Sequence, residues 1–222
     1  MCYNDKRDYS VLKILRNILF AFLPSRIKVF YLQRMGHSVH SSARIGFAYL
    51  DIKNITMESE SFIGHGNIFT NISKIHLEHG SRINRWNRFT SNPNYNACLH
   101  LKPRASIALR HYFDVCALIE VGHDTIIGGH RSSFFTHSKG LREIDYAKPI
   151  IIGDWCYLGS NLAVPPGLTL GSHCWVGMGS VISGNHADSH YKLFVGNPAK
   201  VVKDIPKDSL YYKQDLIVHP KN

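Results

Sequence analysis

Residues 152–182 read IGDWCYLGSNLAVPPGLTLGSHCWVGMGSVI, and every sixth position from the first is aliphatic. These positions are Ile152, Leu158, Val164, Leu170, Val176 and Ile182. A period of six matches neither the 3.6-residue period of a helix nor the two-residue period of a plain strand. It matches a chain that turns a corner after each short strand, so that one side chain in six points inside. Such a repeat is typical of a parallel β-helix, in which stacked coils bury a continuous core.

The same rhythm continues upstream, with changes of register. Three further sets of residues keep the six-residue spacing: Ile45, Met57, Ile63, Phe69 and Ile75; Leu77, Ile83 and Phe89; Leu109, Val115, Val121, Ile127 and Ser133. Three faces close a coil of about 18 residues, so we expect residues 40–200 to form about eight coils. Loops or bulges should leave the prism wherever the register changes. A β-sandwich of short strands is the alternative, which a sustained period of six disfavours.

The chain has 222 residues and a formal net charge of +10, from 26 Lys and Arg against 16 Asp and Glu. A chain of this length can form a single domain that consists of one array of repeats. Aromatic residues are not interleaved with the basic ones and no nucleic-acid-recognition motif is present, so nucleic acid is not the expected partner. An acidic cofactor, an anionic glycan or a lipid headgroup would be attracted equally well.

Five cysteines stand at positions 2, 98, 116, 156 and 174, without a C-x-x-C pair. Cys156 and Cys174 are one coil apart at the small interior position of the repeat. This spacing predicts stacked reduced thiols in a cytoplasmic protein rather than a zinc site.

The longest early apolar run, residues 18–23, is too short to span a bilayer, and it does not resemble a secretory signal.

Residues 1–36 differ in kind from the repeat. Helical spacing relates Val11, Ile14, Leu15, Ile18, Leu19 and Phe22, with basic residues among them. Pro24 interrupts the pattern, which resumes over 27–35 and ends at Gly36. We expect a helical cap or a contact with a neighbouring subunit, the alternative being an amphipathic segment at the inner face of the membrane. The expected units are residues 1–36, a β-helix domain over 37–204, and a C-terminal tail or short helix over 205–222.

Residues 138–150, SKGLREIDYAKPI, carry no six-residue rhythm and interrupt the prism just after His137. A loop ejected from a rigid scaffold commonly carries function. A histidine at the base of such a loop, with an ordinary pKa of about 6.5, is suited to take a proton from a hydroxyl at neutral pH. His137 is therefore a candidate general base, one of fourteen histidines in the chain.

From Leu109 to Lys203 the sequence resembles the left-handed β-helix acyltransferases of the hexapeptide-repeat class. The resemblance is carried by RHYFD (110–114), IEVGHDTIIGG (119–129), RSSFFTHS (131–138), KPIIIGDWCYLGSN (148–161), VPPGLTLGSHCWVGMGSVIS (164–183) and VGNPAKVVK (195–203). The opening, KILRNILFAFLPSRIKVFYLQRMGHSV, is similar to that of O-acetyltransferases from surface-polysaccharide gene clusters. The fold that this implies is all-β, a left-handed parallel β-helix with an N-terminal helical segment.

The resemblance implies an acetyl-CoA-dependent O-acetyltransferase that works as a homotrimer, with active sites between neighbouring prisms. The implied acceptor is a sugar hydroxyl of a surface polysaccharide or of its lipid-linked precursor. His137 matches the family's catalytic histidine. Asp114 lies near the family's acidic acceptor-site position, where it either holds the acceptor or orients the imidazole, and His111 has a similar claim. The backbone N–H of Ser160, beside Gly159, matches the family's oxyanion donor.

Acetyl-CoA is the implied acyl donor, and no metal is expected. The positions that match the family's coenzyme A groove are Gly159, Ser160, Met178, Gly179 and Ser183, while Lys200 and Lys203 match basic positions that reach the nucleotide phosphates. The chain departs from the family pattern in two places. His123 follows Gly122 where the family usually has Asp or Asn, and SGNHADSHYKLF (183–194) is an uncommon run before GNPAK. Both departures predict an unusual acceptor pocket.

Two alternative functions stay open. One is an N-acyltransferase that acts on a nucleotide-linked amino sugar or on another small amine or hydroxyl acceptor. The other is a metal-dependent lyase of the γ-carbonic anhydrase type, which needs three histidines around one ion. His123, His130 and His137 recur every seven residues. This spacing is out of step with the six-residue repeat, so the three side chains should face different directions.

Overall fold

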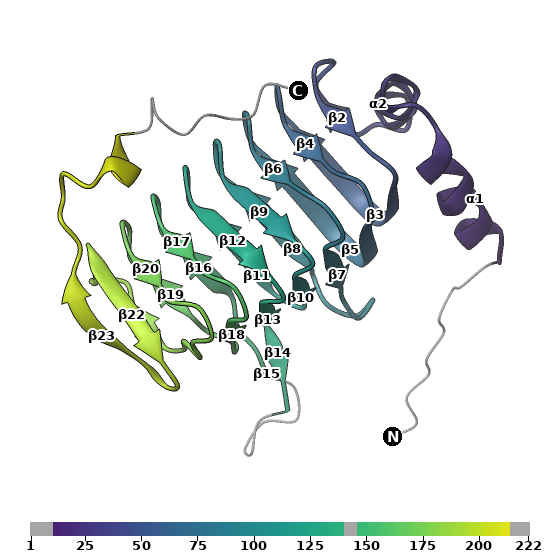
Figure 1. The fold of residues 1–222 in the computed structure, drawn as a ribbon. Helices are drawn as coiled ribbons and strands as arrows, with labels where there is room; N and C mark the ends of the chain where they lie inside the picture. The colour runs from purple at the N-terminus through teal and green to yellow at the C-terminus, as the bar shows by residue number, and fades with distance from the viewer. Residues whose placement is uncertain (1–10, 140–145, 214–222) are drawn as a thin grey trace.

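The computed structural model describes residues 11–139 and 146–213 of the chain. Over these residues the chain winds into a parallel β-helix, with two helices at one end and an antiparallel hairpin at the other (Figure 1). Each coil places short strands on three faces, which we call face 1, face 2 and face 3. The predicted parallel β-helix is thereby confirmed.

The strands of each face pair in parallel with those of the next coil. Face 1 consists of β2 (Arg44–Ile45), β4 (Phe62–Ile63), β6 (Arg82–Ile83), β9 (Ser106–Leu109), β12 (Ile126–His130), β17 (Tyr157–Leu158), β20 (Trp175–Val176) and β22 (Lys192–Gly196). Face 2 consists of the first halves of β3 (Ala48–Met57) and β5 (Asn67–Leu77), then β7 (Arg88–Thr90), β10 (Tyr112–Asp114), β13 (Ser133–Phe135) and β18 (Ala163–Val164). Face 3 consists of β1 (Ser38–Val39), the second halves of β3 and β5, then β8 (Cys98–Leu101), β11 (Leu118–Val121), β16 (Ile150–Ile152), β19 (Thr169–Leu170) and β21 (Asn185–His186).

The eight parallel strands of face 1 count eight coils, as the repeat predicts. Successive coils use 18, 20, 24, 20, 31, 18 and 18 residues, as given by the face 1 pairs Ile45–Ile63, Ile63–Ile83, Ile83–Ile107, Ile107–Ile127, Ile127–Leu158, Leu158–Val176 and Val176–Phe194. Three of the coils that exceed 18 residues contain a change of register or the ejected segment, and extra residues leave the prism there, as expected. The fourth, Ile107–Ile127, lies within a set to which the sequence assigned a constant six-residue spacing.

The six positions of the 152–182 repeat all lie in the buried core. Two upstream positions were assigned wrongly. Leu109 is 43 % exposed and Ser133 is only partly buried, whereas Ile107, Phe113 and Phe134 are fully buried. Ile127 is paired with Ile107, twenty residues earlier, so exact steps of six counted back from Ile127 reach Leu109 instead of Ile107. After Ile127 the register shifts before His130, so that Phe134 and not Ser133 points inside.

Four phenyl rings form a continuous stack inside the prism. Phe69, Phe89, Phe113 and Phe134 come from four successive coils of face 2, with centroids 4.6, 4.6 and 4.7 Å apart and interplanar angles of 3, 9 and 10°. Parallel pairing in register puts identical side chains directly above one another, which makes such a ladder possible.

Cys156 and Cys174 stack in the same way, as predicted: both are buried free thiols, and the Cys174 N–H lies 3.4 Å from Cys156 Sγ.

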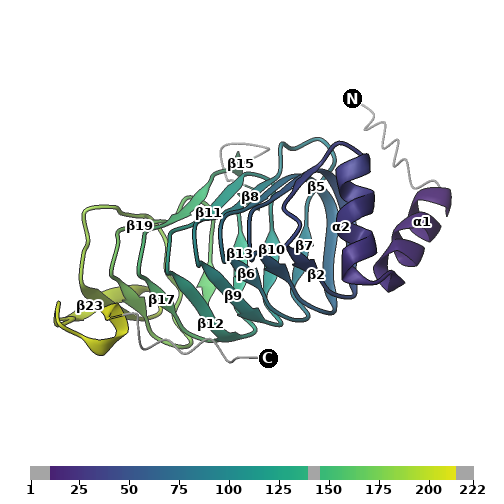
Figure 2. The ribbon, with the colours of Figure 1, turned by 90° about the horizontal axis from the view of Figure 1, so that it is seen from above.

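Helices α1 (Val11–Phe22) and α2 (Ser25–Arg34) occupy the start of the prism, in agreement with the predicted helical segment. Figure 2 shows α2 against the first coil and α1 further out. Lys28 of α2 is 1 % exposed, and its ammonium donates to the carbonyl of Ala21 at 2.8 Å and to that of Gly46. Burial lowers the pKa of Lys28 to about 8. One buried cation thus links both helices to the first coil.

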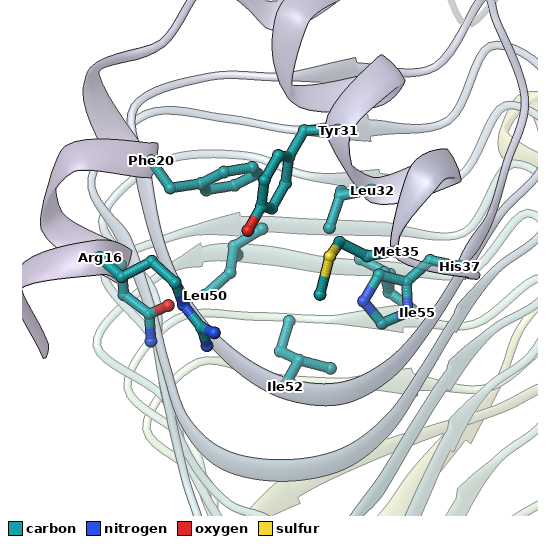
Figure 3. A pocket seen from close by; sticks show the side chains of 10 residues that line it. Arg16, Phe20, Tyr31, Leu32, Met35, His37, Leu50, Ile52 and Ile55 are labelled. Atoms are coloured by element: carbon teal, nitrogen blue, oxygen red, sulfur yellow. The ribbon is translucent and has the colours of Figure 1, made fainter. Parts of the chain in front are cut away.

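A small cavity of about 80 Å³ lies between the two helices and the first coils. Figure 3 shows the side chains of Phe20, Tyr31 and Leu32 facing Leu50 and Ile52 across it. These side chains cover the apolar interior that would otherwise be exposed at the first coil. Both helices thus pack against the first coils of the prism.

A hairpin follows the last coil and lies within the domain that the sequence predicts over 37–204. β23 (Ala199–Asp204) pairs antiparallel with β22, and the peptide bond between Asn197 and Pro198 in the turn is cis. A 3-10 turn, η1 (Leu210–Tyr212), follows, and its Tyr211 hydroxyl donates to the carbonyl of Cys156 at 2.9 Å.

None of the helices in the described ranges is both long and apolar enough to cross a bilayer.

Candidate active site

His137 lies at the corner between faces 2 and 3, where the chain leaves the prism. β14 (His137–Ser138) pairs antiparallel with β15 (Tyr146–Ala147), and the Lys148 N–H donates to the carbonyl of Thr136 at 2.8 Å. This ribbon is the base of the ejected segment predicted over 138–150, of which residues 140–145 lie outside the described ranges. The chain returns to the core at Ile150, which is fully buried. His137 is therefore attached to a rigid coil on one side and to the ejected segment on the other.

Two residues of the preceding coil lie beside His137. A carboxylate oxygen of Asp114, the sulfur of Cys116 and a ring nitrogen of His137 all lie within 4.8 Å of one another. Asp114 ends β10 and is paired with Phe135 of β13, so the stacking of coils places it next to the histidine. The structure thus brings together His137 and Asp114, two of the three predicted catalytic candidates.

The hydroxyl of Thr136 holds this corner in place. It donates to the carbonyl oxygen of Asp114 at 2.8 Å and accepts the N–H groups of Cys116 and Ala117 at 2.7 and 3.0 Å. Its side chain is completely buried. Because one hydroxyl satisfies three backbone groups, the turn that carries Asp114 and Cys116 is fixed relative to the residue that precedes His137.

Tyr95 packs against His137 from a second excursion of the chain. The tyrosine lies in the loop between β7 and β8, and its ring centroid is 5.3 Å from that of the imidazole, at an interplanar angle of 56°. Tyr95, Cys116 and Thr136 are absent from the site predicted from sequence. The available signal was the change of register after Phe89, which marks an ejected loop but does not show where its tip packs.

The Cys116 thiol is not suited to act as a nucleophile. Burial raises the pKa of this thiol to about 11, and the nearby charge of Asp114 acts in the same direction. The thiolate is the reactive form of cysteine. At neutral pH Cys116 is therefore a neutral neighbour of the imidazole.

His111, the third catalytic candidate, lies inside the prism. It is 2 % exposed; its backbone N–H donates to the side-chain oxygen of Asn87 at 2.9 Å, and its Nδ1 accepts the Ser132 N–H at 3.1 Å. Its buried Nε2 has no partner among the described residues. Burial lowers the pKa of His111 to about 4, with a smaller contribution from His130. The structure does not bring His111 into the group around His137.

The buried imidazole predicts acid sensitivity. In the unfolded chain His111 takes up a proton near pH 6.5, whereas in the folded chain it stays neutral down to about pH 4. Acid therefore favours the unfolded chain, and its effect grows as the pH falls from 6.5 to 4. We expect this residue to cost on the order of 2–3 kcal/mol of stability between pH 7 and pH 4.5. Urea unfolding at both pH values should show a pH dependence smaller by that amount in His111→Asn than in the wild type; equal pH dependences would contradict the assignment.

Residues predicted to contact coenzyme A line the corner between faces 1 and 2 in the late coils. The Gly179 N–H donates to the carbonyl of Ser160 at 2.9 Å, which stacks the two positions on successive coils. Met178 is 71 % exposed, and a Cβ placed on Gly159 would lie 3.0 Å from the Met178 nitrogen. In the described part of the chain, the Ser160 N–H donates to no acceptor. This corner therefore offers an open surface and a backbone donor.

The remaining predicted coenzyme A residues lie at the same end of the prism. Lys200 and Lys203 belong to β23, paired with Val195 and Leu193 of β22, and both are exposed. Ser183 is exposed just after the last repeat position, Ile182. The structure brings the two lysines onto one strand but gives no direct contact between them and Ser160.

Two groups of side chains in the described ranges lie close enough to hold a metal ion: Asp114 with Cys116 and His137, and His76 with Glu78 and His100 on face 3. His100 already contacts carboxylates through both ring nitrogens, with Nε2 at 2.6 Å from Glu78 and Nδ1 at 3.1 Å from Glu120.

The histidines His123, His130 and His137 lie at three different corners of the prism. Within one chain they do not converge on an ion.

No protein-family model matches the chain. A Staphylococcus aureus (strain Mu50) protein, named as an inferred acetyltransferase, is 37 % identical over 79 residues, which are 36 % of this chain and 37 % of that protein. The galactoside O-acetyltransferase of Escherichia coli (strain K12) is 31 % identical over 74 residues, 33 % of this chain and 36 % of that enzyme. The matched segment therefore spans little more than a third of these curated relatives.

Solved structures share the fold over most of the chain. The polysialic acid O-acetyltransferase OatWY superposes with a TM-score of 0.59 at 14 % identity, covering 81 % of this chain and 93 % of that one. A variant of AntD, an N-acyltransferase from Bacillus cereus solved with coenzyme A and an amino-sugar nucleotide, superposes with a TM-score of 0.54 at 14 % identity, covering 87 % and 97 %. Both likenesses concern the arrangement of the coils.

Proposed function

Because the chain shares sequence and fold with the hexapeptide-repeat β-helix acetyltransferases, we propose that it transfers an acetyl group from acetyl-CoA to a sugar hydroxyl. The acceptor belongs to a surface polysaccharide or to its lipid-linked precursor. One observation carries the proposal: His137 stands beside the Asp114 carboxylate at the base of the ejected segment, on a scaffold that acetyltransferases use.

In the proposed reaction, a ring nitrogen of His137 takes the proton of the acceptor hydroxyl. The hydroxyl oxygen forms a bond to the acetyl carbon, the C–S bond of the thioester breaks, and the imidazolium returns the proton to the departing sulfur. General-base assistance of this kind is worth about 10²–10⁴ in rate. Asp114 stabilises the imidazolium or holds the acceptor, and the Ser160 N–H is placed to receive the negative charge that develops on the carbonyl oxygen.

The positions of His137 and Ser160 support a homotrimer. His137 lies at the corner between faces 2 and 3, and Ser160 at the corner between faces 1 and 2. One strand and its two corners separate these edges, about six residues or roughly 20 Å of extended chain. A single thioester cannot touch both. The site is complete when the His137 corner of one prism faces the Ser160 corner of its neighbour.

The proposed binding site for acetyl-CoA includes the two lysines of β23, Lys200 and Lys203. Replacing both Lys200 and Lys203 by glutamine removes two ammonium groups that we assign to the nucleotide phosphates of acetyl-CoA. We expect KM for acetyl-CoA to rise about tenfold with little change in kcat, since the lost contacts are the same in ground and transition states. The exposed pair Lys53→Gln and Lys74→Gln serves as the charge-matched control. An unchanged KM in the β23 variant would remove the lysines from the donor site.

The function is tested by following thiol release from acetyl-CoA with a panel of sugars, and by mass spectrometry of the product. Acetyl esters on hydroxyl acceptors are the expected result. Acetamides formed only with amino sugars would establish the N-acyltransferase alternative instead. Absence of coenzyme A binding in calorimetry would overturn both.

A further inference from the structure

Four arginines without an acidic partner among the described residues gather at the corner between faces 1 and 2 and on the adjoining part of face 2. Arg85 and Arg88 flank Trp86 in one coil, while Arg110 and Arg131 stand at the same corner in the next two coils. The Arg131 N–H donates to the carbonyl of Arg110, and the Arg110 N–H to that of Arg85, each at 3.1 Å. We call Arg85, Arg88, Arg110 and Arg131 the arginine patch.

The arginine patch is an unfavourable arrangement unless an anion binds to it. All four side chains are exposed, and across residues 11–139 and 146–213 none forms an ion pair or a side-chain hydrogen bond. Neighbouring coils lie about 4.8 Å apart, so like charges stacked at one corner repel one another. Elsewhere a comparable arginine is paired: Arg104 contacts Asp124 through both Nε and a terminal nitrogen. Guanidinium groups clustered in this way are suited to phosphate.

An apolar groove adjoins the arginine patch directly. It has a volume of about 480 Å³ and lies between α1 and the first coils of face 2. Its lining includes Ile14 and Ile18 from the helix, and Phe47, Ile68 and Trp86 from the coils. Ile18, Phe47 and Ile68 are each between 42 and 43 % exposed, and Trp86 is 58 % exposed. Ile68 is paired with Arg88, so the groove ends where the patch begins.

Face 2 continues from the arginine patch to the candidate catalytic pair. Arg88 is paired with Tyr112, whose ring lies 5.6 Å from that of Phe135. Asp114 follows two residues later on the same strand, beside His137. About 14 Å of extended chain separates Arg110 from Asp114, a span that one or two sugar rings can bridge. From the corner between faces 1 and 2 to the corner between faces 2 and 3, the structure therefore presents an apolar groove, a cationic patch, two aromatic rings and a candidate base.

We propose that the acceptor sugar is carried on a lipid phosphate or diphosphate. Its hydrocarbon chain lies in the groove under α1, its phosphate groups bind the arginine patch, and its sugar extends over Tyr112 toward His137. This inference rests on the proposed acetyl transfer and selects the lipid-linked form of the acceptor. Neither a free sugar nor a neutral lipid would use all three surfaces.

The binding surface is tested without turnover, using farnesyl diphosphate as the probe. Its affinity is measured by calorimetry and compared with those of farnesol and inorganic pyrophosphate, which each retain one half of the probe. We expect farnesyl diphosphate to bind at least tenfold more tightly than either half. The double variant Arg88→Gln with Arg110→Gln should weaken it by tenfold or more, whereas the charge-matched pair Arg26→Gln with Arg34→Gln on α2 should leave the affinity unchanged.

Three results would overturn the proposal. Equal binding of pyrophosphate and farnesyl diphosphate would indicate a site for anions alone, such as an acidic glycan. Equal binding of farnesol would indicate an apolar groove with no role for the arginines. Displacement of the probe by saturating coenzyme A would assign the arginine patch to the donor nucleotide. Since none of these readouts requires acetyl transfer, they separate a failure of this inference from a failure of the proposed reaction.

Discussion

Replacing His137 by alanine is expected to lower kcat by about 10²- to 10⁴-fold while leaving the affinity for coenzyme A unchanged. The imidazole is the group of the Asp114–Cys116–His137 corner that can accept a proton at neutral pH, because burial keeps the Cys116 thiol protonated. The loss should fall on kcat and on kcat/KM alike, because the base acts in the transition state. Thiol release from acetyl-CoA measures the rate, and calorimetry with coenzyme A measures binding.

His40→Ala is the matched control, because His40 lies at a corner of the first coil and its ring contacts only Ser42 among the described side chains. Its activity should equal that of the wild type. A His137→Ala protein that retained full turnover would remove this residue from catalysis and direct attention to other proton acceptors. A variant that lost coenzyme A binding as well would show a folding defect instead.

Replacing Phe113 by alanine is expected to lower the free energy of unfolding by about 3–5 kcal/mol. Phe113 is fully buried and stacks between Phe89 and Phe134 at 4.6 and 4.7 Å. Each coil of a repeat array contacts mainly its neighbours, so the cavity would break the ladder at its middle and weaken both adjoining interfaces. Urea unfolding followed by circular dichroism measures the change.

Phe30→Ala provides the comparison for this prediction. The Phe30 ring is 57 % exposed on α2 and contacts Arg34, so its removal should cost less than about 1 kcal/mol. Similar small losses in both variants would mean that the interior ladder is loosely packed. Hydrogen exchange would then locate the coils that open first, and we expect the greatest loss of protection in the coils beside Phe113.

The six-residue spacing of aliphatic residues was sufficient to predict the coils, their number and the ejected segment after His137. This succeeded because each repeat position faces the interior independently of distant contacts, as Ile152 to Ile182 illustrate. The stacked thiols of Cys156 and Cys174 followed from the same rule. The prediction that Leu109 is buried was wrong because the coil from Ile107 to Ile127 has 20 residues instead of 18, which the spacing alone does not reveal.

Only some of the residues around His137 could be predicted from the sequence. Asp114 entered through a family resemblance, and the structure places it one coil away, beside His137. Tyr95 could not be found, because the loop that carries it packs across coils and its path is set by tertiary contacts. The burial of His111 could not be predicted from the six-residue spacing either, because an interior position is usually apolar. The hydrogen bonds that it accepts from Ser132 and donates to Asn87 become visible only when three coils are stacked.

The two ends of the prism have a consequence for self-association. A parallel solenoid with open ends presents unpaired backbone donors and acceptors to which another copy could add, and repetition of that step would give a fibre. Here β23 runs antiparallel along β22 and covers the last edge of face 1, while α2 lies across the first coil. The first coil and the last edge of face 1 are thus covered, so another copy cannot add to the stack in register at these edges. The parallel pairing that joins eight coils within one chain is therefore kept from joining face 1 of one chain to face 1 of the next.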